Sequence, residues 1–285
     1  MHLLQEMVAA QKAGKKVGIY SCCSANEFVL RAALQRGAER GTTVLIEATA
    51  NQVNQFGGYM GMTPLDFYEY VQGLIRECGM EPSRVILGGD HLGPLTWTEL
   101  PAQAAMENAV ELVRQFAAAG FTKIHLDTSM RLADDSRTER LPDAVIARRA
   151  AQLCGAAEEA YRLRKKEHPE AEAPVYVIGS EVPIPGGAQE AEHVVVTASE
   201  DCRRTYQTFA DAFAQAGLQD AFARVIGMVV QPGVEFGDAE ICAYDRAAAA
   251  ELMGVLRELP VVFEGHSTDY QTPENLREMV EDGIV

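Results

Sequence analysis

The chain has 285 residues, of which 47% are hydrophobic and 23% are charged, and this length and composition predict a globular protein with one core. Its 41 acidic against 25 basic residues give a net charge of −16, which argues against nucleic acid or an anionic membrane surface as a partner. The N-terminus lacks a signal-peptide pattern and no apolar run approaches the length of a membrane span, so we expect a cytoplasmic protein.

Short apolar, β-branched runs alternate with longer amphipathic segments, a pattern typical of βαβ units and a parallel sheet. The capping residues Ser24, Thr63 and Thr272 precede three of the amphipathic segments. The predicted strands are residues 17–22, 43–49, 84–90, 123–127, 175–181, 225–231 and 261–266. The predicted helices are residues 27–40, 64–79, 103–119, 143–168, 200–215, 245–258 and 273–281.

Each predicted strand ends in a polar or glycine-rich turn. A TIM-type (β/α)8 barrel carries its catalytic groups on the loops that follow the strands, whereas an open doubly wound sheet concentrates them at one switch point. Seven polar strand ends favour the α/β barrel, as a single domain over residues 1–285. An eighth strand would begin at the final EDGIV, so we expect this strand to be missing or truncated. A longer chain, a partner or the N-terminal helix are the alternatives for covering the gap.

The sharpest local signal is LGGDHLGP, at the end of the third predicted strand, where two glycines allow close backbone approach beside Asp90 and His91. Such a pair supplies an acid/base and a metal ligand, the alternative being a turn-capping Asp and a packed His. His266 ends the seventh predicted strand and Glu181 ends the fifth, so both are expected at the same barrel mouth. Two histidines and a carboxylate predict an open divalent-metal site.

Residues on the fourth predicted strand alternate between two faces. Lys123, His125 and Asp127 share one face, which we expect to point inward, and Ile124 and Leu126 share the other. His125 suits a metal ligand and a structural histidine about equally. Asp127, nearer to the mouth, is expected to bind a sugar hydroxyl or to position a ligand.

Amide side chains and a glycine turn follow the second predicted strand, a composition that suits recognition of a polyol. A loop that is hydrogen-bonded to itself is the alternative. The predicted substrate-binding residues, there and at the other strand ends, are Glu47, Asn51, Gln55, Asp127, Ser129 and Asp269.

Two other chemistries find no support in the sequence. A Schiff-base aldolase needs a desolvated lysine near the barrel mouth, but Lys123, the one lysine on a predicted strand, stands at the beginning of that strand. A kinase would need a phosphate-binding loop, and the pattern G-x-x-x-x-G-K-[ST] does not occur.

Six segments spread over essentially the whole chain resemble the GatZ/KbaZ family: IEATANQVNQFGGYMGMTP, ILGGDHLGP, AAGFTKIHLDTSM, YVIGSEVPIPGGA, VVQPGVEF and FEGHSTDYQTP. The resemblance implies a component of D-tagatose-1,6-bisphosphate aldolase that acts on a phosphorylated ketose in galactitol and tagatose catabolism. Two alternatives come with it. One is an independent, metal-dependent 4-epimerase that interconverts fructose 6-phosphate and tagatose 6-phosphate. The other is a non-catalytic subunit that stabilises a separate class II aldolase chain.

A more distant resemblance to class II aldolases implies roles for individual residues. Asp90 would be the acid/base, and Glu181 would be both a catalytic carboxylate and a metal ligand beside His91 and His266. The implied cofactor is a divalent metal, with Zn²⁺ as the first choice, and a homo-oligomer is a further expectation. Gln231 stands where class II aldolases carry another histidine after the sixth strand, so it is expected to be a weaker ligand or none.

Overall fold

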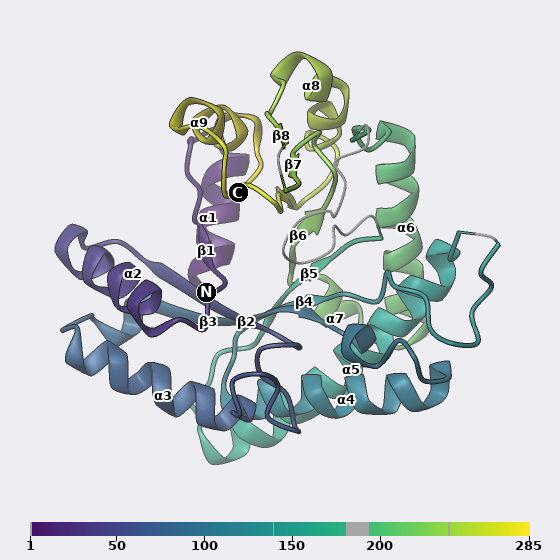
Figure 1. Ribbon diagram of the computed structural model, residues 1–285. Coiled ribbons are helices and arrows are strands. Elements are labelled where there is room, and N and C mark those ends of the chain that lie inside the picture. Colours follow the sequence, from purple (N-terminus) through teal and green to yellow (C-terminus); the bar gives the residue numbers. More distant parts are fainter. Residues whose placement is uncertain (1, 139, 181–193, 239) are drawn as a thin grey trace.

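The computed structural model describes residues 2–138, 140–180, 194–238 and 240–285. Within these ranges, seven parallel strands form one curled sheet in the order β1-β2-β3-β4-β5-β6-β9, surrounded by helices (Figure 1). The strands of the sheet are β1 (Ser21–Cys22), β2 (Val44–Thr49), β3 (Val85–Leu92), β4 (Lys123–Leu126), β5 (Val175–Ile178), β6 (Val225–Val229) and β9 (Val262–Glu264). The predicted α/β barrel is therefore confirmed, with seven of its strands in place.

Helices follow the strands as the alternating sequence pattern predicts. They are α1 (Leu3–Lys12), α2 (Glu27–Arg40), α3 (Pro64–Glu77), α4 (Ala102–Ala119), α5 (Asp143–Glu167), α6 (Ser199–Gln215), α7 (Gln219–Phe222), α8 (Arg246–Val255) and α9 (Pro273–Asp282). None of the helices in the described ranges is long and apolar enough to cross a membrane. The short antiparallel pair β7 (Glu235–Phe236) and β8 (Ile241–Cys242) was not predicted.

Two of the three predicted helix caps are confirmed. Thr63 and Thr272 accept a backbone N–H in the first turns of α3 and α9. The predicted cap of α2, Ser24, was wrong by two residues, because Asn26 caps this helix by accepting from the Phe28 amide. Ser24 instead accepts from the amide of Asn26 and so supports the cap from outside the helix.

Several strands end earlier than the sequence predicts. The sheet ladder stops at Ile178 in β5, at Val229 in β6 and at Glu264 in β9. Glycine and polar residues follow Ile178 and Glu264, and one further apolar residue, Val230, follows β6, so strand pairing stops before the predicted ends. β3 is the exception, because it continues to Leu92 and keeps Asp90 within the ladder.

The alternation of side chains along the strands divides the apolar residues between two cores. Outward-facing residues such as Ile124 and Leu126 pack with the surrounding helices, as predicted for β4. Inward-facing residues such as Leu45 and Ile86 pack with α1, which contributes Leu4 and Val8 to the barrel interior. An apolar layer therefore fills part of the interior, and the polar side chains occupy the rest.

The sheet is open between β1 and β9, its two edge strands. Next to β9, Ile284 makes one parallel bridge with Phe263, at the position of an eighth strand. The N-terminal segment reaches across this side, since the Gln11 side chain donates to the carbonyl of Val280 in α9 (2.6 Å) and Gly18 packs against the same valine. Of the predicted alternatives, the N-terminal helix is the one that the described residues place here.

Candidate functional site

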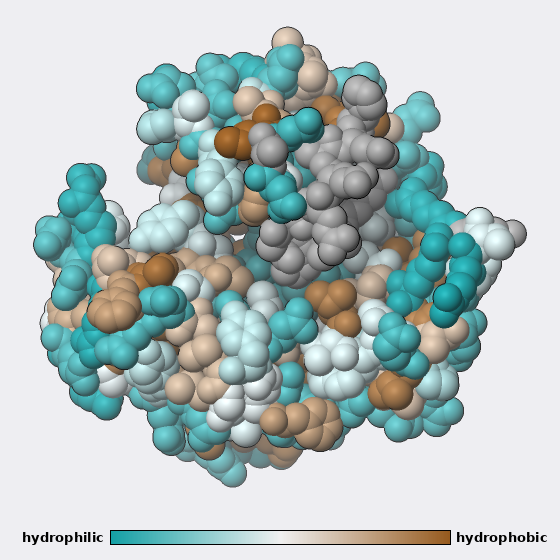
Figure 2. All heavy atoms as spheres, in the orientation of Figure 1, coloured by the Kyte–Doolittle hydropathy of each residue, from teal (hydrophilic) through white to brown (hydrophobic). Residues whose placement is uncertain are grey.

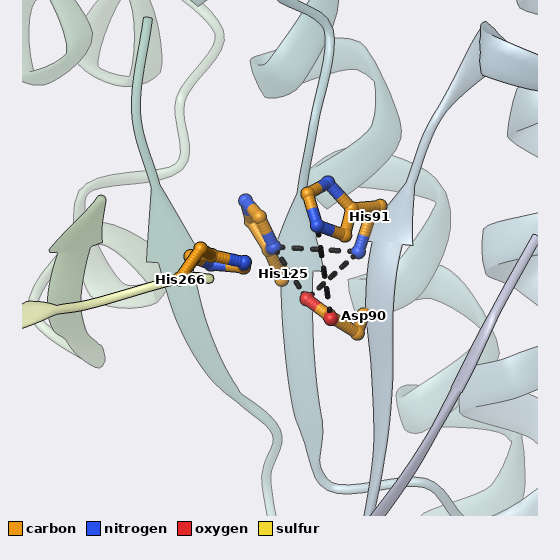
Figure 3. Close-up of side chains that lie close together, drawn as sticks. All are labelled: Asp90, His91, His125 and His266. Atoms are coloured by element: carbon orange, nitrogen blue, oxygen red, sulfur yellow. Dashed lines mark hydrogen bonds and ion pairs between the residues drawn. The ribbon is translucent and has the colours of Figure 1, made fainter. Parts of the chain in front are cut away.

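Four polar side chains meet at the mouth of the barrel (Figure 3). Asp90 and His91 come from β3, His125 from β4 and His266 from the loop after β9. Each offers one potential ligand atom, and these atoms all lie within 4.8 Å of one another. The ring centroid of His91 is 4.9 Å from that of His125 and 4.8 Å from that of His266. Three imidazoles at this spacing form a donor set suited to Zn²⁺, and the carboxylate of Asp90 lies beside them.

Glycines in β3 and the following turn bring neighbouring chain segments close to Asp90. A Cβ atom on Gly88 would lie 2.4 Å from the Oε1 atom of Glu47. A Cβ atom on Gly93 would lie 1.6 Å from the carbonyl oxygen of Asp127. The close backbone approach predicted for the first of these glycines is confirmed, and Gly93 makes a second approach of the same kind.

Backbone strain is concentrated at the same place. Among the residues that the structure describes, two non-glycine residues have a positive φ, His91 at 48° and Ser267 at 56°. Such conformations cost on the order of 1–3 kcal/mol and persist where the surroundings fix them. One of the two belongs to the four-residue cluster and the other directly follows His266, so the backbone is strained on both sides of the candidate site.

Asp127 fixes the orientation of the His91 ring. Its Oδ2 atom lies 2.9 Å from Nδ1 of His91, and its Oδ1 atom accepts from the backbone N–H (3.1 Å) and the hydroxyl (2.7 Å) of Ser129. Burial opposes ionisation, but the hydrogen bond from His91 lowers the pKa of Asp127 below its usual value. Both carboxylate oxygens are thus engaged within the protein, and Nε2 of His91 remains for a ligand. This geometry supports the positioning role expected for Asp127 over sugar binding, and gives Ser129 a supporting role.

Asp90 has one engaged oxygen and one that faces the cluster. Its Oδ1 atom accepts from the His91 amide (3.0 Å) and lies 2.8 Å from Nδ1 of His125. Its Oδ2 atom lies 3.8 Å from Nε2 of His91. Although burial disfavours the charged form, His91 and the hydrogen bond from His125 hold the pKa of Asp90 well below its usual range. Asp90 is therefore an anionic carboxylate with one oxygen available to a ligand.

The surroundings of His125 favour a metal ligand over a structural histidine, the two roles that its sequence position leaves open. Burial lowers the pKa of this fully buried histidine, which favours the neutral ring. When Nδ1–H donates to Asp90, the Nε2 atom carries the free lone pair, and in the structure that atom is buried without a hydrogen-bond partner. A buried nitrogen without a partner is costly unless something binds it, so His125 has the features of a metal ligand.

Lys123 lies among carboxylates at one side of the cluster. Its Nζ atom is 2.8 Å from Oε2 of Glu47 and 2.8 Å from Oε2 of Glu264. Burial works against the charge of Lys123, but Glu264 and Glu47 raise its pKa above the usual value. Lys123 lines the same cavity as Asp90, so its position on the strand does not disqualify it as a Schiff-base lysine. The raised pKa argues against this role, because a lysine must lose its proton to form a Schiff base.

The cluster borders a cavity of about 730 Å³, which lies in the size range of small-molecule sites. Its polar wall includes Asp90, His91 and His266, and Tyr59 and Asp269 lie near its opening. The remaining wall is apolar and includes residues of α1 and of the inner faces of β2, β6 and β9. The cavity combines polar groups able to bind a sugar with an apolar wall.

Gln231, one of the predicted metal ligands, does not join the cluster in the structure. The Oε1 atom of Gln231 accepts from the amides of Gly233 and Val234 at 2.9 Å each, so this side chain caps a turn. That position agrees with the expectation that Gln231 is a weak ligand or none. Glu181 lies outside the described residues.

The predicted substrate-binding residues divide into two groups. Asn51 and Asp269 line the cavity and are exposed at its mouth. Gln55 donates to the carbonyl of Asn108 in α4 (3.0 Å), so it bonds a neighbouring helix and not its own loop. Glu47 also lines the cavity, but it is fully buried and paired with Lys123, which makes it part of the internal charge network.

Sequence reasoning missed Glu264. Its Oε1 atom lies 3.2 Å from Nε2 of His266, so it orients that ring much as Asp127 orients His91. The sequence did contain a signal for this pairing. Residues two positions apart on a strand share a face, and Glu264 precedes His266 by two positions in the predicted strand.

Residues 4–285 match the protein family described as "D-tagatose-1,6-bisphosphate aldolase subunit GatZ/KbaZ-like". The chain belongs to the GatZ/KbaZ-like family. It is 50% identical over 280 residues to the D-tagatose-1,6-bisphosphate aldolase subunit GatZ of Salmonella heidelberg (strain SL476), a match that covers 98% of this chain and 64% of the relative. The GatZ protein of Salmonella agona (strain SL483) gives the same identity and coverage. The chain thus spans somewhat less than two thirds of the length of these curated relatives.

Two solved structures share the fold of this chain. A probable tagatose 6 phosphate kinase from Sinorhizobium meliloti 1021 superposes with a TM-score of 0.82 at 47% identity, over 94% of this chain and 63% of the other. A fructose-bisphosphate aldolase from Campylobacter jejuni superposes with a TM-score of 0.60 at 14% identity, over 99% of this chain and 73% of the other. The second likeness shows a shared barrel fold.

Proposed function

We propose that this GatZ/KbaZ-like chain is a metal-dependent component of a D-tagatose-1,6-bisphosphate aldolase and acts on a phosphorylated ketose. The observation that carries the proposal is the convergence of Asp90, His91, His125 and His266 on one point beside the cavity. A subunit with a purely structural role has no physical need for such a convergence. The names of the curated GatZ relatives supply the substrate.

The donor set fits a divalent metal, for which we propose Zn²⁺. The unpartnered Nε2 atom of His125 is one argument for the fit. Charge is another, because Glu47 and Glu264 contact the ammonium group of Lys123, while the carboxylates of Asp90 and Asp127 contact His125 and His91. A bound cation offsets part of this excess negative charge. A zinc ion at this place supplies Lewis-acid polarisation of the carbonyl and hydroxyl oxygens of a bound ketose.

The protein side chains then have separate tasks. The free Oδ2 atom of Asp90 accepts the proton of the C4 hydroxyl as the C3–C4 bond breaks, and returns it in the reverse direction. Asp127 and Glu264 hold the rings of His91 and His266. Asn51 and Asp269, at the mouth, are placed to hydrogen-bond the hydroxyl groups of the sugar.

A 4-epimerase is the second candidate function, because it shares the bond-breaking step with an aldolase. If the aldehyde leaves the cavity, the outcome is aldol cleavage. If it rotates and is added back, the outcome is the C4 epimer. The cavity extends from the mouth to the apolar layer beside α1, and closure of its mouth over the aldehyde would favour the epimer.

A partner subunit is compatible with the surface. Figure 2 shows hydrophobic residues gathered on the face over α2, and Phe28 of that helix is 82% exposed. The adjacent Val29 is also exposed, and contiguous exposed apolar patches, unlike single residues, mark interaction sites. We therefore propose a separate class II aldolase chain as a binding partner. Phosphoryl transfer is not proposed, because the sequence lacks a phosphate-binding loop.

The test is an assay of the purified protein, alone and with added Zn²⁺, Mg²⁺ or Mn²⁺, on fructose 6-phosphate and on tagatose 1,6-bisphosphate. Triose phosphates from the bisphosphate establish the aldolase, and tagatose 6-phosphate from fructose 6-phosphate establishes the epimerase. The Asp90→Asn variant is the matched control, since it should keep the fold and lose either activity. A metal-loaded protein that is inactive alone but increases the activity of an added class II aldolase chain would have the subunit role instead.

A further inference from the structure

A row of polar side chains crosses the interior of the barrel. The hydroxyl of Ser21 in β1 donates to Oε2 of Glu47 in β2, and the same oxygen lies 2.8 Å from Nζ of Lys123 in β4. The ammonium group also lies 2.8 Å from Oε2 of Glu264 in β9. The row therefore begins on one edge strand and ends on the other, and links two edges that the sheet ladder of the described ranges leaves unconnected.

His266 is the member of the four-residue cluster that the sheet supports least. The other three members lie on β3 and β4, which are paired with neighbouring strands on both sides. His266 lies in the loop after the edge strand β9, and the next residue, Ser267, has a positive φ. The position of its ring therefore depends on side-chain contacts, and Oε1 of Glu264, which lies 3.2 Å from Nε2 of His266, supplies a hydrogen bond.

We propose that Lys123 is a positioning residue for His266 and acts through Glu264. The ammonium group binds one oxygen of the Glu264 carboxylate, and the other oxygen of this carboxylate holds the imidazole. The inference rests on the metal site of the proposed function, because His266 is one of its four residues. It assigns neither Lys123 nor Glu264 as a ligand of the metal.

Contacts to both of its oxygens fix the carboxylate of Glu264. A carboxylate held at one oxygen can turn about its side-chain bonds, whereas a second, charge-assisted contact fixes its plane. The group that makes this second contact is itself held, because Lys123 is 2% exposed and the carboxylate of Glu47 binds it as well. A displaced Glu264 would therefore lose a partner that cannot follow it, and this keeps the His266 ring in place.

A buried ion pair that only stabilises the barrel is the alternative role for Lys123. Such a pair would change the free energy of unfolding and leave the affinity for zinc unchanged. A positioning role predicts a change in affinity, because groups that orient a metal-binding histidine typically contribute about 10- to 100-fold. The two roles therefore differ in a quantity that can be measured on the folded protein.

The experiment is a double-mutant cycle on zinc affinity, with the wild-type protein, Lys123→Met, Glu264→Gln and the protein with both changes. Methionine keeps a chain of similar length and removes the ammonium group. Competition with a chromophoric chelator measures the affinity, and circular dichroism checks folding. In a second measurement Co²⁺ replaces zinc, because its visible absorption spectrum changes when an imidazole leaves the metal. His266→Ala supplies the reference spectrum.

Arg149→Met is the matched control. Arg149 is a buried cation, 7% exposed and paired with Asp135 at 2.8 Å, and it does not line the cavity. Its replacement should lower stability and leave both the zinc affinity and the Co²⁺ spectrum at their wild-type values.

Lys123→Met is expected to weaken zinc binding by about 10-fold, and to shift the Co²⁺ spectrum toward that of His266→Ala. In the Glu264→Gln background it should have no further effect, because the carboxylate through which it acts is already lost. Weakening by the same factor in both backgrounds overturns the inference, and so does a folded Lys123→Met protein with wild-type affinity or a wild-type Co²⁺ spectrum.

If Lys123→Met does not fold, Lys123→Met/Glu47→Gln takes its place, since this protein loses one positive and one negative charge and keeps the net charge of the row. Failure of this second variant to fold overturns the inference, because Lys123 would then hold the whole barrel and not one ring. Wild-type protein without bound zinc would refute the proposed metal site itself, so failure of the inference and failure of the proposed function are distinguishable.

Discussion

The Nδ1 atom of His91 lies 2.9 Å from Oδ2 of Asp127, and this contact fixes which nitrogen of the ring faces the candidate metal position. Carboxylates that orient a metal-binding histidine typically contribute about 10- to 100-fold to affinity. We expect Asp127→Asn to weaken zinc binding by about that factor, measured by competition with a chromophoric chelator.

Ser129→Ala is the matched control for this contact. It removes the hydroxyl that donates to Oδ1 of Asp127 but leaves the contact between Asp127 and His91 in place, so its effect on zinc affinity should be smaller. An Asp127→Asn protein with unchanged zinc affinity and a raised KM would show that Asp127 binds the sugar instead.

The different environments of His125 and Gln231 lead to opposite expectations. His125→Ala removes an imidazole of the cluster and should lower the amount of bound zinc. Gln231→Ala removes an acceptor of a turn and should leave zinc binding unchanged, with at most a small loss of stability. Metal analysis of both variants after dialysis decides between this ligand set and the one that includes Gln231.

Gly93→Ala is expected to prevent correct folding or to lower the free energy of unfolding by at least about 3 kcal/mol, because the new Cβ atom would overlap the carbonyl oxygen of Asp127. Gly73→Ala in α3 is the control. Its Cβ atom meets nothing within 4 Å, so alanine should stabilise the helix by up to about 1 kcal/mol. Urea unfolding measures both, and equal effects would show that the close contact at Gly93 is relieved by movement of the backbone.

The ion pair of Asp135 and Arg149 should make stability depend on pH. Two hydrogen bonds of 2.8 Å from Arg149 lower the pKa of the Asp135 carboxyl below its ordinary 3.8. The ionised form therefore stabilises the fold above pH 3.8, and the contribution disappears as the pH falls through the lowered pKa.

At neutral pH, Asp135→Asn should lower the free energy of unfolding by about 2 kcal/mol. The difference from the wild-type protein should shrink in acid, as measured by urea unfolding on both sides of pH 3.8. A difference that stays constant with pH would mean that the charge of Asp135 contributes nothing.

The sequence predicted the sheet and most helices because apolar periodicity and capping residues are local signals. The boundaries of α2 agree with the prediction, and the inward and outward faces of β4 are confirmed. Strand ends were less predictable. The apolar run of β6 continues one residue past the sheet, to Val230, and only the path of the neighbouring strand decides where pairing stops.

The candidate site was predictable in part. Asp90, His91 and His266 were expected at one mouth because parallel strands end on one side of a barrel, and the structure brings them together. The pairing of Asp127 with His91, and of Lys123 with two glutamates, depends on distances between strands, which periodicity does not contain. The assignment of Gln231 came from resemblance alone, and this residue has a local partner that the resemblance did not show.

The most direct test of the metal site is the zinc content of the wild-type protein beside that of His91→Ala and His266→Ala, each dialysed against the same free zinc concentration and checked for folding by circular dichroism. We expect stably bound zinc in the wild-type protein and a large loss in both folded variants. Zinc bound equally by all three, or by none, would contradict a metal centre formed by His91 and His266.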